Sequence, residues 1–234
     1  LWVLLFGLET FVRQRVGRGQ RRRRPDPHDS GVGRRFGPPS AELARLGSFG
    51  LAARTASQTT YRKVMEQTLE PVSDWPDRLV VTAIDADTGE AVALDRSSGV
   101  PFVDAMAATC AVPAFMPLVT IGEHRYMDGG MTSQTHAHLA RGHDEVLVIA
   151  PLDLGRLGAE VERLRAAGSR VTVVSPGPEA RRVIGRNVSL LDPARRARAA
   201  QAGLLDGRRA AAPDQEKKLV SADATSAGAS SGRS

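Results

Sequence analysis

An aspartate followed by two glycines is the feature of this sequence best suited to chemistry. Asp128 follows the apolar pair Tyr126-Met127 and precedes Gly129 and Gly130. A carboxylate here can act as a general base, but at an ordinary pKa it is a weak base and must touch the hydroxyl that it deprotonates. Because glycine lacks a Cβ atom, Gly129 and Gly130 can adopt positive φ and let another loop approach closely. Asp-Gly is also a common turn dipeptide, so the motif alone has a structural interpretation as well.

Regular patterning begins at Ala41 and predicts the elements that position this motif. A nearly continuous apolar run over residues 79–84 predicts a strand buried on both faces, as in a parallel sheet covered by helices. A turn at residues 87–90 then leads to a returning strand. Three helices are also predicted before Asp128: one over 41–57, one from Thr59 or Thr60 to Leu69, and one over 103–111. The returning strand covers 91–94, and residues 118–121 and 125–127 form a hairpin.

After the motif, the pattern predicts a β-α-β unit. A helix over Gln134–Arg141 is expected to end at Gly142, since glycine commonly follows the last turn of a helix. Strands over 145–150 and 171–174 flank a helix over 157–167, and such crossovers are nearly always right-handed. An Ala/Arg-rich helix is predicted after Pro193.

Residues 78–151 as a whole resemble the C-terminal half of a patatin-like phospholipase domain. The matching motifs, in order, are the strand at 79–85 with its Asp87-Thr88-Gly89-Glu90 turn, the run Ala107-Ala108-Thr109-Cys110-Ala111-Val112-Pro113-Ala114-Phe115-Met116-Pro117, the hairpin into Tyr126-Met127-Asp128-Gly129-Gly130, and Gly142-His143-Asp144 before the strand at 146–149. The resemblance implies an α/β, three-layer fold with a mainly parallel central sheet. It also implies a serine lipid-acyl hydrolase with a Ser-Asp dyad, in which Asp128 is the general base. The substrate would be a lipid or fatty-acyl ester, with no cofactor or metal and with peripheral contact to a membrane.

The nucleophile of that dyad is not identified upstream of Asp128. The family places it in a Gly-x-Ser-x-Gly elbow between a strand and a helix, and an oxyanion loop rich in glycine lies near the N-terminus. Gly47-Ser48-Phe49-Gly50 lacks this spacing, and Gly228-Ala229-Ser230-Ser231-Gly232 lies in a low-complexity tail, so we interpret that match as chance. We therefore expect a domain truncated at its N-terminal side and inactive as given. The alternatives are a degenerate, non-catalytic patatin-like protein that binds lipid or a protein partner, and an unrelated α/β domain, which burial of Asp128 away from any cleft would favour.

Charge and composition set the predicted domain boundaries. Residues 1–40 hold nine arginines against three acidic residues, which accounts for the whole net charge of +6. A folded nucleic-acid-binding face would spread its basic charge over the domain, so that class is excluded. We predict an irregular segment over 1–40, a partial patatin-like domain over 41–193, an Arg/Ala-rich helix over 194–220 and a disordered tail over 221–234.

The remaining candidates for chemistry are a cysteine and the histidines. A single cysteine, Cys110, excludes an intramolecular disulfide, fits a reducing, cytoplasmic location and is expected to be a small buried hydrophobic residue. His136 and His138 are two apart and would not share a helix face, so together with His143 they are interpreted as surface histidines rather than metal ligands.

Overall fold

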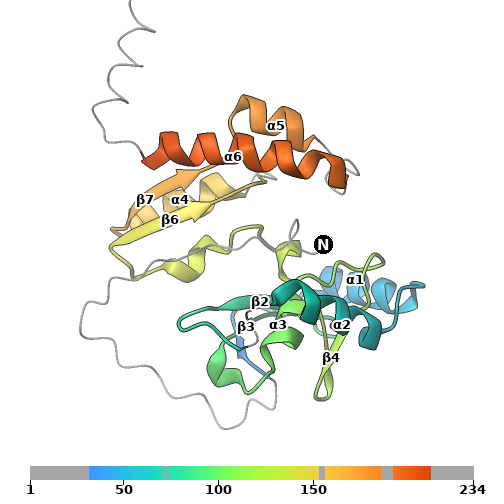
Figure 1. The fold of residues 1–234 in the computed structure, drawn as a ribbon. Coiled ribbons are helices and arrows are strands. Elements are labelled where there is room, and N and C mark those ends of the chain that lie inside the picture. The colour runs from blue at the N-terminus through green and yellow to red at the C-terminus, as the bar shows by residue number, and fades with distance from the viewer. Residues whose placement is uncertain (1–31, 71, 73, 153–155, 186–191, 212–234) are drawn as a thin grey trace, which may run out of the picture. The chain divides into compact units, whose positions relative to one another are not determined.

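The computed structural model describes residues 32–70, 72, 74–152, 156–185 and 192–211 (Figure 1). They belong to two compact units, divided between Val173 and Val174, and each unit is described separately. The first unit contains, in chain order, β1 (Arg34–Arg35), α1 (Ala41–Ala52), α2 (Gln58–Leu69), β2 (Val81–Asp85), β3 (Ala91–Leu94), α3 (Phe102–Thr109), β4 (Val119–Ile121), β5 (His124–Asp128), β6 (Glu145–Ile149), α4 (Leu157–Ala166) and all but the last residue of β7 (Arg170–Val174).

A five-stranded sheet in the order β1-β3-β2-β5-β4 carries the motif. Each neighbouring pair of strands is antiparallel, and Asp128 at the end of β5 lies opposite Ala83 of the central strand β2. Helices α2 and α3 lie beside these strands in Figure 1. The sheet therefore holds the aspartate at the end of an inner strand.

Helices cover both faces of this sheet. Alternate residues of a strand point to opposite faces, and Ala83 and Tyr126 belong to a buried cluster that includes residues of α2 and α3. Ile84 and Met127 point the other way, into a second cluster against which Leu43 of α1 packs. The central strands are thus buried on both sides.

The predicted mainly parallel central sheet is wrong for these five strands. Residues 86–90 join β2 to β3, and Gly122-Glu123 join β4 to β5. Parallel neighbours need a crossover of a dozen or more residues, whereas connections this short join antiparallel strands. The apolar run at residues 79–84 did predict a buried strand. Its two-sided burial comes from helices on both faces and not from parallel pairing.

The predicted β-α-β unit is formed by β6, α4 and β7. β6 and β7 make a separate two-stranded sheet. The two strands start side by side, because the Arg170 N–H donates to the Asp144 carbonyl at 2.8 Å and the Arg170 guanidinium pairs with Glu145 at 2.5 Å. Val148 of β6 and Leu164 of α4 are buried in the cluster between strands and helix.

The predicted helix over Gln134–Arg141 is wrong. Only Ala137–Ala140 form a short 3-10 turn, which His136 precedes with a left-handed backbone at φ 44°. A residue in this region cannot continue a right-handed helix. The segment between β5 and β6 is therefore a loop, and its side chains do not follow helical spacing.

The described fold begins upstream of the predicted boundary at residue 41. β1 pairs with β3, with Arg35 opposite Val92. The Arg35 guanidinium forms an ion pair with Asp85 at 3.1 Å and a second one with Glu90. The four consecutive arginines at 21–24 and the predicted disordered tail at 221–234 lie outside the described residues.

The second unit contains α5 (Pro178–Ile184) and α6 (Arg196–Ala211). The two helices pack together, and the Gly177 N–H before α5 donates to Asp206 Oδ2 of α6 at 2.7 Å. The helix predicted after Pro193 is confirmed over Arg196–Ala211.

Candidate active site

The Asp128 side chain lies in the interior of the first unit. The residue is only 1% exposed. Its backbone N–H donates to the Ala111 carbonyl at 3.0 Å, which links the end of β5 to the segment that follows α3. Sheet pairing on one side and this bond on the other fix the position of the carboxylate.

The two carboxylate oxygens of Asp128 have different environments. Oδ1 accepts the N–H of Gly130 at 2.6 Å and so caps a 3-10 turn at Gly129–Met131. Oδ2 is buried and has no hydrogen-bond partner among the described residues. Burial raises the pKa of Asp128 to about 7, and the single bond from Gly130 only partly opposes this rise. Such a carboxyl is a much stronger base than an ordinary aspartate, because basicity follows pKa.

Tyr61 of α2 is a titratable group whose pKa the charge of Asp128 affects. Its hydroxyl lies 3.2 Å from the Cys110 carbonyl and is buried. Burial raises the pKa of Tyr61 strongly, and the charges of Cys110 and Asp128 raise it further. Cys110 itself is buried at the end of α3, as expected of a small hydrophobic residue.

Gly129 is required by packing and not by its backbone dihedral. A Cβ atom there would lie 2.5 Å from both the carbonyl oxygen and the Oγ1 of Thr82 in β2. The glycines with positive φ in the described residues do not include Gly129 or Gly130, so neither uses the freedom of φ that glycine allows. The predicted close approach does occur at Gly129, and a neighbouring strand makes it.

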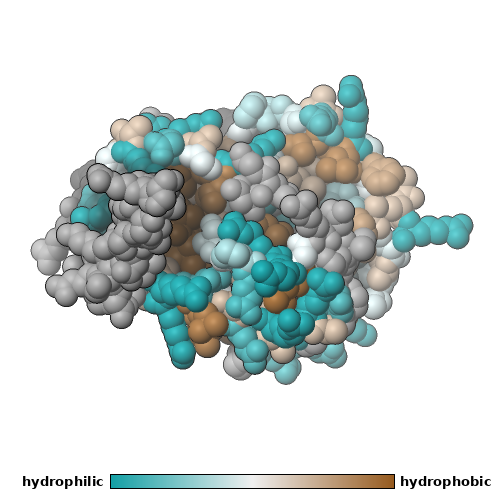
Figure 2. All heavy atoms as spheres, turned by 90° about the horizontal axis from the view of Figure 1, so that it is seen from above, coloured by the Kyte–Doolittle hydropathy of each residue, from teal (hydrophilic) through white to brown (hydrophobic). Residues whose placement is uncertain are grey.

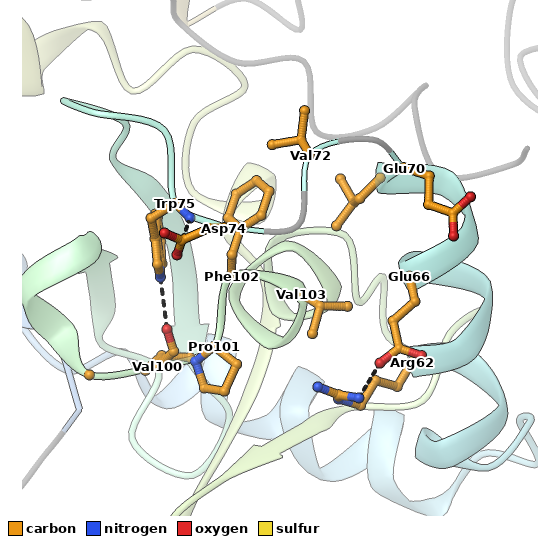
Figure 3. Close-up of a pocket in the computed structure, with 12 residues that line it drawn as sticks. Arg62, Glu66, Glu70, Val72, Asp74, Trp75, Val100, Pro101, Phe102 and Val103 are labelled. Atoms are coloured by element: carbon orange, nitrogen blue, oxygen red, sulfur yellow. Dashed lines mark hydrogen bonds and ion pairs between the residues drawn. The ribbon is translucent and has the colours of Figure 1, made fainter.

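A cleft of about 650 Å³ opens in the first unit, but Asp128 is not among the residues that line it. It lies between α2 and the start of α3 (Figure 3). On its wall the Trp75 Nε1–H donates to the Val100 carbonyl at 2.7 Å. Asp128 instead adjoins the segment after the C-terminal end of α3. Its burial away from this cleft matches the geometry expected of an unrelated α/β domain, so another observation must decide the family.

The comparison with protein families gives that observation. The model of the patatin-like phospholipase family matches residues 8–141, which is more than half of the chain and includes Asp128, Gly129 and Gly130. The chain belongs to the patatin-like phospholipase family. In a comparison with curated proteins the chain has no significant match.

Membership of the patatin-like family places the chain in a lineage of lipid acyl hydrolases. The interpretation as an unrelated α/β domain is therefore set aside. The match also begins at residue 8, within the segment for which sequence patterning predicted no recognisable fold. It ends at Arg141, before β6, α4 and β7.

The loop that follows the patatin-like motif brings His136 against it. The His136 Nε2 donates to the Gly129 carbonyl at 2.9 Å, and the residue is 8% exposed. The interpretation of His136 as a surface histidine is wrong. The rings of His136 and His138 lie 5.6 Å apart, although helical spacing would have separated them. Sequence spacing carried no signal of this contact, because it depends on the left-handed backbone at His136.

Glu160 of α4 holds the same loop in place. Its Oε2 accepts the Thr135 hydroxyl at 2.8 Å and the Ala137 N–H at 3.0 Å. Burial raises the pKa of Glu160, but His138, Ser133, Thr135 and the Ala137 N–H outweigh it and hold the pKa at about 2. The carboxylate is thus charged and supports the backbone that presents His136.

The described residues contain no group of three histidine, cysteine, aspartate or glutamate side chains arranged to hold a metal ion. Among the same residues, no helix combines the length and the apolar character needed to cross a bilayer.

Proposed function

We propose that Asp128 occupies the general-base position of a serine–aspartate dyad for the hydrolysis of lipid acyl esters, and that the serine of this dyad is not among the described residues. The supporting observation is the carboxylate itself, whose Oδ2 is buried without a hydrogen-bond partner among the described residues while its pKa is about 7. An oxygen in this state accepts a proton from a hydroxyl at neutral pH, since general bases work best with a pKa near the working pH.

The proposed chemistry needs one proton acceptor and one hydroxyl. Asp128 Oδ2 takes the proton of a serine hydroxyl while the serine Oγ attacks the carbonyl carbon of the ester. The proton then passes to the oxygen of the leaving alcohol, and an acyl-serine remains. Asp128 next takes a proton from a water molecule, which attacks the acyl-serine and releases the fatty acid. Asp128 passes this proton to the departing serine Oγ, so that both residues return to their starting states. The aspartate thus does the work of the histidine in a triad.

The serine partner of Asp128 is not identified. No hydroxyl of the described residues hydrogen-bonds to Oδ2. Ser230, in the sequence that fits the Gly-x-Ser-x-Gly pattern, lies outside the described residues. We therefore expect the chain by itself to show no ester turnover.

A fluorophosphonate probe and a soluble fatty-acyl ester test the dyad. We expect neither labelling nor turnover from the wild-type chain. Activity that is lost in Asp128→Asn but kept in Ser230→Ala would establish the general base and a serine elsewhere, which peptide mapping would locate. Activity that is unchanged in Asp128→Asn would contradict the role given to this aspartate.

A non-catalytic lipid-binding function is the second candidate, and exposed apolar side chains favour it. Phe49 and Leu51 of α1 are 62% and 42% exposed, and Phe115 is 70% exposed. The two segments adjoin, because a Cβ atom on Gly50 would lie 3.0 Å from the Pro113 side chain. Figure 2 shows apolar side chains reaching the surface among hydrophilic ones. Aromatic residues at a surface can insert into a lipid interface, which would give the peripheral membrane contact expected of a cytoplasmic protein of this family.

Sedimentation with phosphatidylcholine vesicles tests this second function. We expect the double variant Phe49→Ser, Phe115→Ser to bind vesicles at least about tenfold more weakly than the wild type. Each substitution removes an aromatic ring whose apolar surface would be buried in the lipid on binding. Val80→Ser is the matched control, because Val80 is 46% exposed and belongs to a different segment. Equal binding by the double variant and the wild type would exclude these aromatic residues as a lipid contact.

A further inference from the structure

One peptide group lies between the Asp128 carboxylate and the His136 ring. Its carbonyl belongs to Gly129 and accepts the His136 Nε2–H at 2.9 Å. Its N–H belongs to Gly130 and donates to Asp128 Oδ1 at 2.6 Å. A peptide group is planar and conjugated, and in the trans form its carbonyl and N–H point in opposite directions. The imidazole and the carboxylate therefore bond to opposite edges of one polarisable group.

We propose that His136 is a positioning residue that sets the basicity of Asp128 through the Gly129–Gly130 peptide. The inference rests on the proposed role of Asp128 as general base. A donor on the carbonyl withdraws electron density from the peptide and makes its N–H a better donor, because hydrogen bonds in a chain polarise one another. The stronger N–H bond stabilises the charged carboxylate and opposes the effect of its burial.

The contacts of the His136 ring define its tautomer. A carbonyl oxygen can only accept, so Nε2 carries the hydrogen. Nδ1 is then the acceptor in the neutral ring, and it is buried with no hydrogen-bond partner among the described residues. A second proton on Nδ1 would make the ring a cation and strengthen its bond to Gly129. Protonation of His136 and ionisation of Asp128 therefore favour each other, and by linkage the coupling is reciprocal.

The backbone at His136 is held in a strained conformation. Its φ of 44° lies in the left-handed region, which costs free energy for a residue other than glycine. Ser133 Oγ accepts the N–H of His136 at 2.9 Å and the N–H of Thr135 at 3.2 Å, which fixes the bend. Strain that the surrounding structure maintains is typical of functional segments.

Other groups also affect the pKa values of His136 and Asp128, and a titration of either residue includes their effects. Burial lowers the pKa of His136, the bond to Gly129 raises it, the charge of His138 lowers it, and Glu160 raises it. Thr132 also donates to the Gly129 carbonyl through its N–H at 3.2 Å and its hydroxyl at 3.1 Å. Of these donors only His136 changes charge. On the Asp128 side, Tyr61 is a titratable group whose pKa the charges of Asp128 and Cys110 raise.

Carbon-13 NMR of the Asp128 carboxyl tests the proposal in the intact chain. We expect the titration midpoint to rise by about 0.1–0.6 pH unit in His136→Ala, the size expected when one charge-assisted bond weakens by a tenth to a third. His136→Gln keeps an N–H donor near the Nε2 position and should recover most of this shift. His143→Ala is the matched control, because His143 does not bond to the Gly129–Gly130 peptide, and it should leave the midpoint unchanged.

A reciprocal experiment covers the case in which His136→Ala does not fold. In the wild type, the nitrogen-15 and proton shifts of the His136 Nε2–H should follow the titration of Asp128, as a step separate from the ring's own titration at lower pH. Asp128→Asn should remove that step only. Identical His136 titrations in the wild type and Asp128→Asn, or an Asp128 midpoint that His136→Ala leaves unchanged, would overturn the proposal. Neither readout depends on ester turnover, so a missing hydrolase activity would affect the proposed function alone.

Discussion

Replacing Asp128 by asparagine should change how the stability of the protein depends on pH. The pKa of Asp128 is about 7 in the folded chain against 3.8 for an ordinary aspartate. Because the fold favours the protonated form, the contribution of this group to stability is fully present below pH 3.8 and is lost as the pH rises through 7. Asparagine is neutral at every pH and keeps an oxygen that can accept the Gly130 N–H.

The size of the effect follows from the difference in pKa. A shift of about three pH units corresponds to about 4 kcal/mol of unfolding free energy at pH well above 7. The steepest change is about 1.4 kcal/mol per pH unit, between the two pKa values. The relevant quantity is the stability of the wild type minus that of Asp128→Asn. It should fall by about 4 kcal/mol from pH 4 to pH 8, whatever fixed cost the buried amide adds.

Urea unfolding between pH 4 and pH 8.5, followed by tryptophan fluorescence, measures this difference. Trp75 is 4% exposed in the core of the first unit and reports its unfolding. Asp85→Asn is a control of opposite sign. Burial raises the pKa of Asp85, but the N–H groups of Thr88 and Asp87 together with Arg35 lower it below the ordinary value. The stability that Asp85 contributes is therefore present at neutral pH and lost on acidification.

Two results would refute the reasoning about Asp128. A difference that stays constant across this pH range would mean that its pKa is not raised. A difference that grows as the pH rises would mean that the carboxylate is stabilised by the fold, as Asp85 is, and is no better a base than an ordinary aspartate.

Glu160→Gln should lower the free energy of unfolding by about 2–3 kcal/mol at neutral pH, because the pKa of Glu160 is about 2 instead of 4.5. The stability that Glu160 contributes is present above pH 4.5 and disappears as the pH falls toward 2. The free energies of unfolding of the variant and the wild type, measured in urea, should therefore converge in acid. Gly129→Ala should destabilise the protein by about 1–3 kcal/mol, since its Cβ would meet Thr82 at 2.5 Å. Gly158→Ala in α4 is its control, with no atom within 4 Å, and should be neutral or stabilise by up to about 1 kcal/mol. Equal melting temperatures for the two alanine variants would contradict the packing argument.

The elements that lead to Asp128 from residue 41 onward could be predicted from the sequence, because they depend on local patterns. β3 lies at Ala91–Leu94 as predicted, and β2, α3 and the hairpin that delivers Asp128 lie within a few residues of their predicted bounds. Strand orientation could not be read from the apolar run at residues 79–84, because burial on both faces is common to parallel strands and to antiparallel strands with helices on each side. The connection lengths, which the sequence does contain, were the better signal.

The surroundings of Asp128 could not be predicted, because they bring together distant segments. Tyr61 comes from α2 and Thr82 from β2, and no spacing rule links either to the motif. His136 is only eight positions away, but its contact with Gly129 needs a left-handed residue that a helical interpretation excludes. Asp128 could thus be singled out from the sequence as a candidate general base, whereas its raised pKa could be obtained only from the fold.

The structural role of Asp128 as a cap does not account for the burial of its second oxygen. As the cap of a short turn it needs one oxygen, Oδ1, and asparagine or serine can cap a turn equally well. Its second oxygen, Oδ2, is buried and lacks a hydrogen-bond partner among the described residues. It therefore destabilises the folded state whenever the carboxyl is ionised. A residue chosen for stability alone would avoid this cost, and local violations of this kind are typical of functional sites. The same burial that weakens the fold as the pH rises toward 7 gives Asp128 the raised pKa on which its proposed role as general base depends. A gain of stability at pH 8 in Asp128→Asn would measure what this burial costs the fold.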